Sequence, residues 1–204
     1  MQPEQQPLFP EYISPEEVNA LPLAHFEGKI VVITQPQHVA AAVAEIASQP
    51  VSGFDTETRP AFTRGESYNV SLVQLAIPDK VFLFRVNLCG LTPELTALFS
   101  SADTLKVGVA LRDDIIGLQK LRPFEPAGFR EIHDYVKDYG VRNTGLRKLA
   151  AILLGVRISK SQQTSNWENP VLTPNQLRYA ATDAWVCLEM YRVLKEKGLV
   201  DDSD

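Results

Sequence analysis

The stretch Ser52-Gly53-Phe54-Asp55-Thr56-Glu57-Thr58 begins as an apolar run and ends with two carboxylates that are two residues apart. In a β-strand, side chains alternate between the two faces, so Asp55 and Glu57 point to the same side. Two acids held side by side repel each other, and one keeps its proton unless a cation lies between them. Mg²⁺ takes oxygen ligands, carboxylates among them. The stretch therefore indicates either a polar strand end or part of a metal site, and the rest of the chain has to distinguish the two.

A second acidic site follows the strand predicted for residues 104–110. Asp113 and Asp114 lie at the start of a predicted helix, residues 111–121. A carboxylate in a first helical turn complements the helix dipole, which is the simpler explanation for this pair. Asp114 is followed by two isoleucines, so it can project toward the sheet while Asp113 stays in solvent.

A third acid, Asp183, lies in a long apolar helix predicted for residues 174–197. Tyr179 precedes it by four residues, which places both side chains on one helical face. A buried aspartate is costly unless it is paired or bound to a cation, although a Tyr–Asp pair without a chemical role remains an alternative. Four carboxylates, from Asp55, Glu57, Asp114 and Asp183, are enough to hold two divalent cations about 4 Å apart, the arrangement used for phosphodiester displacement.

Strands and helices are mixed along the chain. Strands are predicted for residues 29–34, 51–58, 70–77, 81–86, 104–110 and 131–136, and helices for residues 38–48, 93–100, 111–121, 144–154 and 174–197. This order predicts an α/β domain with a mixed sheet covered on both faces. We expect a Pro-rich extended lead at residues 1–24 that packs on the surface or stays mobile, the domain at residues 25–200, and an acidic tail at residues 201–204.

Composition narrows the class of protein. With 204 residues, 45% of them apolar, the chain is long enough for one globular domain. Its net charge of −5 argues mildly against a large surface that binds polyanions, but not against a local one. Cys89 and Cys187 are far apart, which indicates neither a disulfide nor a zinc site. Without a signal-like or membrane-spanning segment, we expect a soluble, cytoplasmic protein that does not bind a membrane.

The three acidic sites together resemble a known family. Phe54-Asp-Thr-Glu57, Val107-Gly-Val109 followed by Asp114, and Tyr179-Ala-Ala-Thr-Asp183 are similar to the three exonuclease motifs of the DEDD superfamily. The tyrosine is typical of the branch that includes ribonuclease D and the Werner-syndrome exonuclease domain; the other branch has histidine where this chain has Arg178. Similar segments occur in the same order at Arg64-Gly65, Val73-Gln-Leu75, Lys106-Val107, Leu153-Leu-Gly155, Lys160-Ser161, Ser165-Asn-Trp167 and Leu172-Thr-Pro174. The resemblance covers about residues 30 to 195. It implies a ribonuclease H-like fold, a mixed sheet with a central reversed strand.

The resemblance also implies roles for the site residues. Asp55 would bridge two divalent cations, Mg²⁺ or Mn²⁺, and Glu57 and Asp183 would complete the site of the water-activating one. Asp114 would act on the second cation through water, and Tyr179 would orient the attacking water and the scissile phosphate. Asp113 stands where similar sequences have a small residue, so an exchange of roles between Asp113 and Asp114 stays open.

The implied activity is that of a two-metal-ion 3'-5' exonuclease that hydrolyses DNA or RNA from the 3' end and releases nucleoside 5'-monophosphates. A catalytically silent nucleic-acid-binding module on the same fold is the alternative. A third hypothesis, a different two-metal phosphate enzyme, has no separate substrate motif to support it.

A local basic stretch is a candidate substrate surface. From Tyr139 to Trp167 there is no acid, and the basic residues are Arg142, Arg147, Lys148, Arg157 and Lys160. Cationic side chains bind backbone phosphates and aromatic faces stack on bases, so we predict nucleic-acid contacts at Arg147, Lys160, Asn166 and Trp167. The alternative is a solvated helix face with Trp167 in the core. The resemblance favours a single-stranded or recessed 3' end, with Phe62 or Trp167 as the candidate wedge. No protein partner is indicated.

Overall fold

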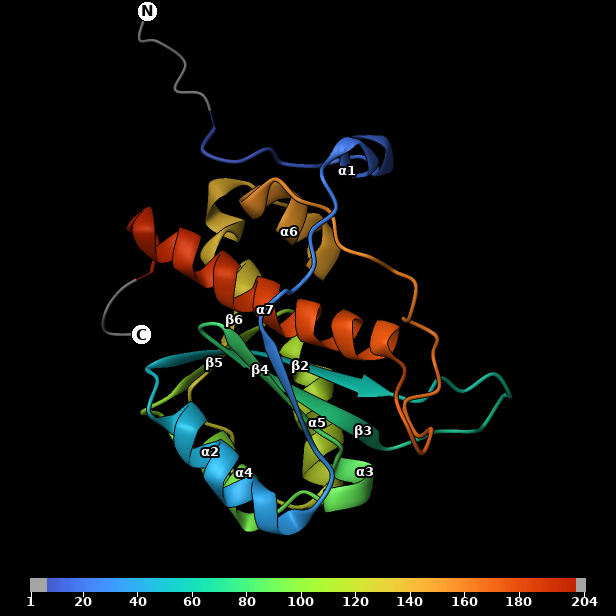
Figure 1. The fold of residues 1–204 in the computed structure, drawn as a ribbon. Coiled ribbons are helices and arrows are strands. Elements are labelled where there is room, and N and C mark those ends of the chain that lie inside the picture. Colours follow the sequence, from blue (N-terminus) through green and yellow to red (C-terminus); the bar gives the residue numbers. More distant parts are fainter. Residues whose placement is uncertain (1–6, 201–204) are drawn as a thin grey trace, which may run out of the picture.

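The computed structural model describes residues 7–200; the predicted acidic tail and the first six residues of the lead lie outside the described residues. At its centre is a six-stranded sheet in the order β1-β4-β3-β2-β5-β6 (Figure 1). The strands are β1 (Lys29–Ile33), β2 (Val51–Thr58), β3 (Val70–Ile77), β4 (Lys80–Phe84), β5 (Leu105–Gly108) and β6 (Phe129–Glu131). β3 runs antiparallel to both neighbours, and the other pairs are parallel. The predicted mixed sheet with a reversed central strand is confirmed.

Helices cover both faces of the sheet, which explains why all eight residues of β3 are buried. On one face, Phe54, Leu75 and Phe84 share a core with α2 (Val39–Ala47), α4 (Pro93–Phe99) and α5 (Leu111–Leu121). The opposite face packs against α7 (Pro174–Glu196), and α6 (Leu146–Leu154) packs on α7 (Figure 1). The remaining helices are α1 (Pro15–Ala20), α3 (Val86–Cys89), η1 (Pro36–His38), η2 (Ile132–Tyr135) and η3 (Lys137–Tyr139).

α7 begins and ends where its sequence predicts. Thr173 and Gln176 form a capping box around Pro174, and Gly198 after the last turn has a φ of 68°. The helix crosses β2 very closely at Gly53, where a Cβ atom would lie 2.0 Å from the Ala184 carbonyl oxygen. Glycine at this crossing therefore lets α7 bring its own side chains down to β2.

Three predicted strands end early, among them the one at residues 104–110, which ends at Gly108. The prediction of a strand at residues 131–136 is wrong: β6 ends at Glu131, and the chain turns into η2. The Glu131 side chain accepts a hydrogen bond from His133 N and caps this turn, which buries Ile132 and Val136 against α6 and α7. The strand predicted for residues 81–86 ends at Phe84, and α3 follows.

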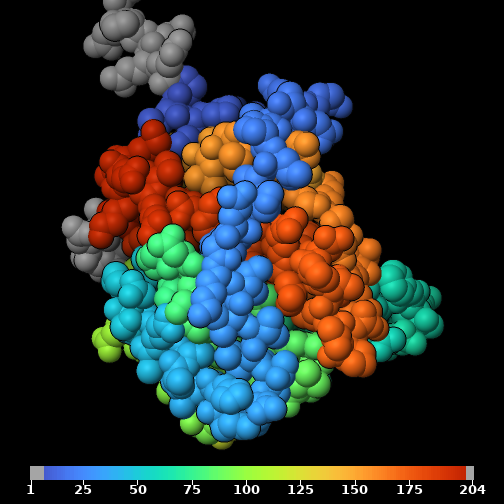
Figure 2. Space-filling view, viewed as in Figure 1, coloured from blue at the N-terminus to red at the C-terminus, as the bar shows by residue number. Residues whose placement is uncertain are grey.

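The described part of the lead packs on the surface, one of the two alternatives, but it is not extended throughout. Ser14 and Glu17 form a capping box that starts α1. Phe9 and Val18 are buried. Figure 2 shows residues 7–24 lying over the surface of the rest of the chain. Within residues 7–200, no helix combines the length and apolar character needed to cross a membrane.

Candidate active site

Three of the predicted acids come together between β2 and α7. Asp55, Glu57 and Asp183 each place a carboxylate oxygen within 4.8 Å of the others. The alternation of β2 turns Asp55 and Glu57 toward α7, the same side as Gly53. Because Gly53 allows the close crossing, Asp183 reaches the two acids from the helix. The predicted convergence of these three residues is thus present in the structure.

The three acids hold protons unusually strongly. Burial and the charges of Asp183 and Asp114 raise the pKa of Asp55 well above its ordinary value. Burial and the charges of Asp55, Asp183 and Asp114 raise the pKa of Glu57 to about 10. Burial also raises the pKa of Asp183 to about 8, against the opposing effects of Tyr179 and Arg147. Such a group stays partly protonated unless a cation neutralises it, and its oxygen-only ligand set fits Mg²⁺ or Mn²⁺.

Asp114 lies beside this group of three but is not part of it. Thr56 Oγ1 donates a hydrogen bond of 2.5 Å to Asp114 Oδ1. Thr56 alternates to the face opposite Asp55 and Glu57, so Asp114 approaches β2 from the α5 side. Burial raises the pKa of Asp114 to about 6, although the hydrogen bond from Thr56 lowers it. Asp113 is exposed, so Asp114 is the acid of this pair that contacts β2, through its hydrogen bond with Thr56.

A further acid, Glu131, holds the start of α5 in place, and the sequence analysis did not identify it. Its Oε2 atom accepts a 3.1 Å hydrogen bond from Leu111 N, next to Ala110 with its left-handed φ of 60°. The sequence gives no signal for this role, because Glu131 was predicted to begin a strand and its partner residue is 20 positions away. Glu131 therefore supports Asp114 through the helix rather than through direct contact.

Tyr179 is half-buried on the same face of α7 as Asp183. Burial, followed by the charges of Asp183, Glu57 and Asp55, raises the pKa of its phenol far above the ordinary value. The phenol therefore keeps its proton and serves as a hydrogen-bond donor. The ring of Trp167 packs near the Tyr179 ring, with 6.0 Å between the two ring centroids.

The prediction that Trp167 contacts nucleic acid is wrong, because its side chain has an exposed fraction of 0%. Trp167 packs in a core cluster with Leu72 and Leu172, and hydrogen bonds hold the loop between α6 and α7 that carries it. The buried Arg85 donates hydrogen bonds to the carbonyl oxygens of Trp167, Asn169 and Pro170, at 3.3, 2.6 and 3.0 Å. Gln176 also donates to Asn166 O, at 3.1 Å. The sequence did not predict that Arg85 and Gln176 hold this loop, because their partners are main-chain atoms.

The basic stretch reaches the acids only in part. Arg147, Lys148 and Lys160 line a hollow that Tyr179 and Asp183 also line. The Arg147 charge lowers the pKa of Asp183, and Arg147 Nε donates to Ile158 O at 3.0 Å.

The other candidate contact residues lie outside this hollow. Arg142 lies apart, in an exposed ion pair with Glu11. Asn166 is exposed and caps a local turn by accepting from Glu168 N. Phe62, with 82% of its surface exposed, lies on the loop that follows the β2 acids.

Comparisons with known proteins show the family to which the chain belongs. A family described as "3'-5' exonuclease" matches residues 30–198. The exonuclease mut-7 homolog of Aedes aegypti is 28% identical over 92% of this chain and 29% of its own length. The bifunctional 3'-5' exonuclease/ATP-dependent helicase WRN of Mus musculus is 29% identical over 87% of this chain and 13% of its own length. The chain thus spans less than a third of either relative.

Among solved structures, the Aedes aegypti Nibbler EXO domain superimposes with a TM-score of 0.73 at 27% identity, covering 82% of this chain and 88% of that one. The resemblance inferred from the motifs and the ribonuclease H-like fold are both confirmed.

Proposed function

Because the chain belongs to the 3'-5' exonuclease family, we propose that it is a metal-dependent exonuclease that removes nucleotides from the 3' end of a DNA or RNA strand. The observation that carries this proposal is the group of three carboxylates on β2 and α7, whose oxygens lie within 4.8 Å of each other. Their raised pKa values support the proposal, because a nearby cation would favour the charged form of these three acids.

In this proposal, Asp55, Glu57 and Asp183 would hold divalent metal. Asp114, which accepts a hydrogen bond from Thr56 on the α5 side of β2, would complete the set of metal-binding acids. Divalent cations, two in this proposal, would supply a nucleophilic water at neutral pH and stabilise the negative charge that develops at the attacked phosphate and the leaving 3' oxygen. The products are nucleoside 5'-monophosphates.

The remaining residues bind and orient the strand. Tyr179, whose phenol keeps its proton, donates a hydrogen bond to the attacking water or to the scissile phosphate. Arg147 and Lys160 lie in the hollow that reaches Tyr179 and Asp183, where their cations can bind backbone phosphates. A single-stranded 3' end suits this site better than a duplex end, because the reacting phosphate has to reach acids that are partly buried.

The test is a nuclease assay on single-stranded DNA and RNA oligomers labelled at the 5' end, with Mg²⁺ or Mn²⁺. The wild type should give a ladder that shortens from the 3' end, and EDTA should abolish it. Asp55→Asn should lower the rate by about a thousandfold or more, since it removes a shared ligand while keeping the side-chain shape. Asp113→Asn, one residue from Asp114 and exposed, is the matched control and should keep wild-type activity. Full activity in Asp55→Asn, or binding without any cleavage, would contradict the proposal.

A further inference from the structure

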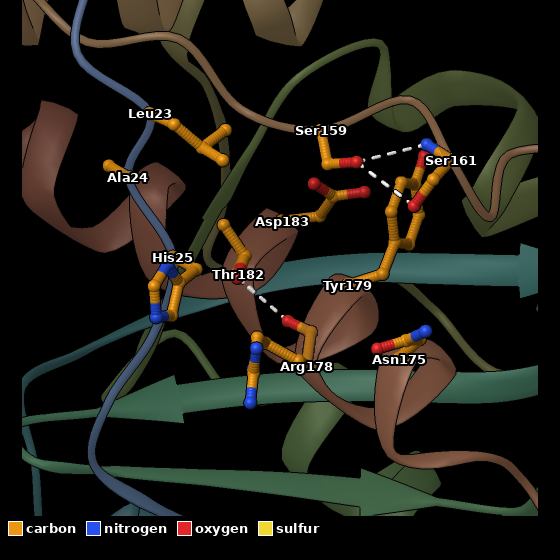
Figure 3. A pocket seen from close by; sticks show the side chains of 10 residues that line it. All are labelled: Leu23, Ala24, His25, Ser159, Ser161, Asn175, Arg178, Tyr179, Thr182 and Asp183. Carbon is orange, nitrogen blue, oxygen red and sulfur yellow. Dashed lines mark hydrogen bonds between the residues drawn. The ribbon is translucent and has the colours of Figure 1, made fainter.

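A second pocket opens onto the same Tyr179 and Asp183, on the side of the lead. It is a cavity of about 230 Å³ between the lead, the loop after α6, and α7. Figure 3 shows its lining: Leu23 and His25 at one side, Ser159 and Ser161 opposite, and Asn175 on α7. A molecule bound here would therefore lie next to the acids.

The part of the chain that forms one wall of this pocket lies outside the family match, which begins at residue 30. It is nevertheless held firmly against α7. Ala24 N donates to Arg157 O at 2.9 Å, and Arg157 N donates to Pro22 O at 3.0 Å. Phe26 N donates to Thr182 Oγ1 at 3.0 Å, one residue from Asp183. Because these bonds use main-chain atoms of Pro22, Ala24 and Phe26, at the end of the lead and just after it, they do not depend on the side chains of Leu23 or His25.

Leu23 and His25 both expose a large part of their surface beside the pocket. Leu23 is an exposed large apolar residue at 51%, and the His25 side chain is 41% exposed. His25 Nε2 lies 3.5 Å from a carboxylate oxygen of Glu27, whose side chain is 83% exposed. An imidazole ring offers a face on which a base can stack, and leucine offers apolar contact.

The opposite wall supplies polar groups. Ser159 Oγ, which bonds to Ser161 N and Ser161 Oγ at 3.0 Å, lines the pocket together with the Asn175 amide and Arg178. Hydroxyl, amide and guanidinium groups suit the sugar hydroxyls and phosphate of a nucleotide. Ser159 also lines the basic hollow of Arg147 and Lys160, so the two spaces meet at this residue.

We propose that Leu23 and His25 are substrate-binding residues: with Ser159, Ser161 and Asn175 they hold the nucleotide at the end of the strand, against Tyr179 and Asp183. This proposal rests on the proposed exonuclease function for the identity of the strand. The pocket takes one nucleotide unit, with its base against Leu23 and His25 and its sugar and phosphate toward the serines. The upstream phosphates continue through the basic hollow.

The experiment compares wild type, Leu23→Ala, His25→Ala and His25→Phe in two measurements. The first is calorimetric binding of AMP and of dAMP to the protein with Mg²⁺. The second is kcat and KM on a 5'-labelled single-stranded oligomer. His25→Ala should weaken binding of the monophosphates and raise KM about tenfold, and Leu23→Ala about threefold, with kcat within about twofold of wild type. His25→Phe, which keeps a ring for stacking, should restore most of the affinity.

Leu8→Ala is the matched control, because Leu8 is an exposed apolar residue of the same lead (49%) that does not line the pocket. It should leave both measurements unchanged. If the wild type cleaves but Leu23→Ala and His25→Ala match it in binding and KM, the pocket assignment is overturned and the exonuclease function stands. If AMP and dAMP bind, and these two variants weaken that binding in a protein that cleaves nothing, the assignment stands and the proposed function fails. Absence of monophosphate binding in an active wild type would also overturn the assignment.

Discussion

Asp55, Glu57 and Asp183 bind protons more tightly in the folded chain than acids do in an unfolded one. Their pKa values are raised, to about 10 for Glu57 and about 8 for Asp183, whereas unfolded acids titrate near 4. Between those values the folded state carries more protons than the unfolded state. The free energy of unfolding of the metal-free protein therefore falls as pH rises through this window, and it is highest at the acidic end.

Replacement of one of the three acids by a neutral residue should reduce this loss of stability at high pH. In EDTA at about pH 8.5, Asp55→Asn should melt about 2–8 °C above wild type, because the other two acids lose a repelling neighbour. At about pH 5, where the wild-type group is largely protonated, the difference should nearly vanish. Differential scanning calorimetry across this range measures both. Asp113→Asn, with an exposed side chain, should show no such pH-dependent gain, and a wild type more stable than Asp55→Asn at pH 8.5 would count against the electrostatic reading.

The contact between β2 and α7 is the element-scale feature on which the site depends. A Cβ atom at Gly53 would lie 2.0 Å from the Ala184 carbonyl oxygen, which is main chain and cannot rotate away. Gly53→Ala should therefore push α7 outward, lower the free energy of unfolding by about 1–3 kcal/mol and reduce nuclease activity about a hundredfold. Gly145→Ala is the control, since a Cβ there meets nothing within 4 Å. Urea unfolding measures the free energy of unfolding, and the strand-shortening assay measures nuclease activity. Wild-type activity in Gly53→Ala would show that the site does not depend on this close contact.

The loop between α6 and α7 is held by a buried cation rather than by a helix or strand. Arg85→Met would leave the carbonyl oxygens of Trp167, Asn169 and Pro170 without their donor, lowering the free energy of unfolding by about 1–3 kcal/mol. Trp167 should become more exposed, and Tyr179 should lose the ring packed behind it. In a Trp185→Phe background, Trp167 is the one remaining tryptophan of the chain, so its emission should shift to longer wavelength. An unshifted emission would show that Arg85 does not hold this loop.

Elements with strong local signals were predictable, and those set by distant partners were not. The strand at residues 51–58 and the helix that begins at Pro174 depend on neighbouring residues, and both predictions are confirmed. α1 carries a capping box at Ser14 and Glu17, but the Pro-rich composition around it obscured the signal. The turn after Glu131 depends on core packing against α6 and α7, which no local pattern reports.

On the scale of the whole molecule, the site is assembled from segments far apart in the chain. The spacing was enough to place Asp55 and Glu57 on one face of a strand and Tyr179 and Asp183 on one face of a helix. That Asp183 joins the other two acids was implied by the family resemblance, and the structure brings the three together. The motif spacing could not show that Trp167 is buried, because the loop that carries Trp167 is held by Arg85, about eighty residues earlier. Nor could it show the wall formed by the lead, which depends on main-chain bonds to Arg157 and Thr182.

The most direct test of the metal site is anomalous diffraction from a crystal of the protein soaked in Mn²⁺. The carboxylates of Asp55, Glu57 and Asp183 should lie within bonding distance, about 2 Å, of an anomalous peak, with a second peak toward Asp114. A crystal of Asp55→Asn treated in the same way should lose both peaks. Manganese bound only elsewhere on the surface, with the three carboxylates free of it, would contradict the assignment of these residues as the metal ligands of an exonuclease.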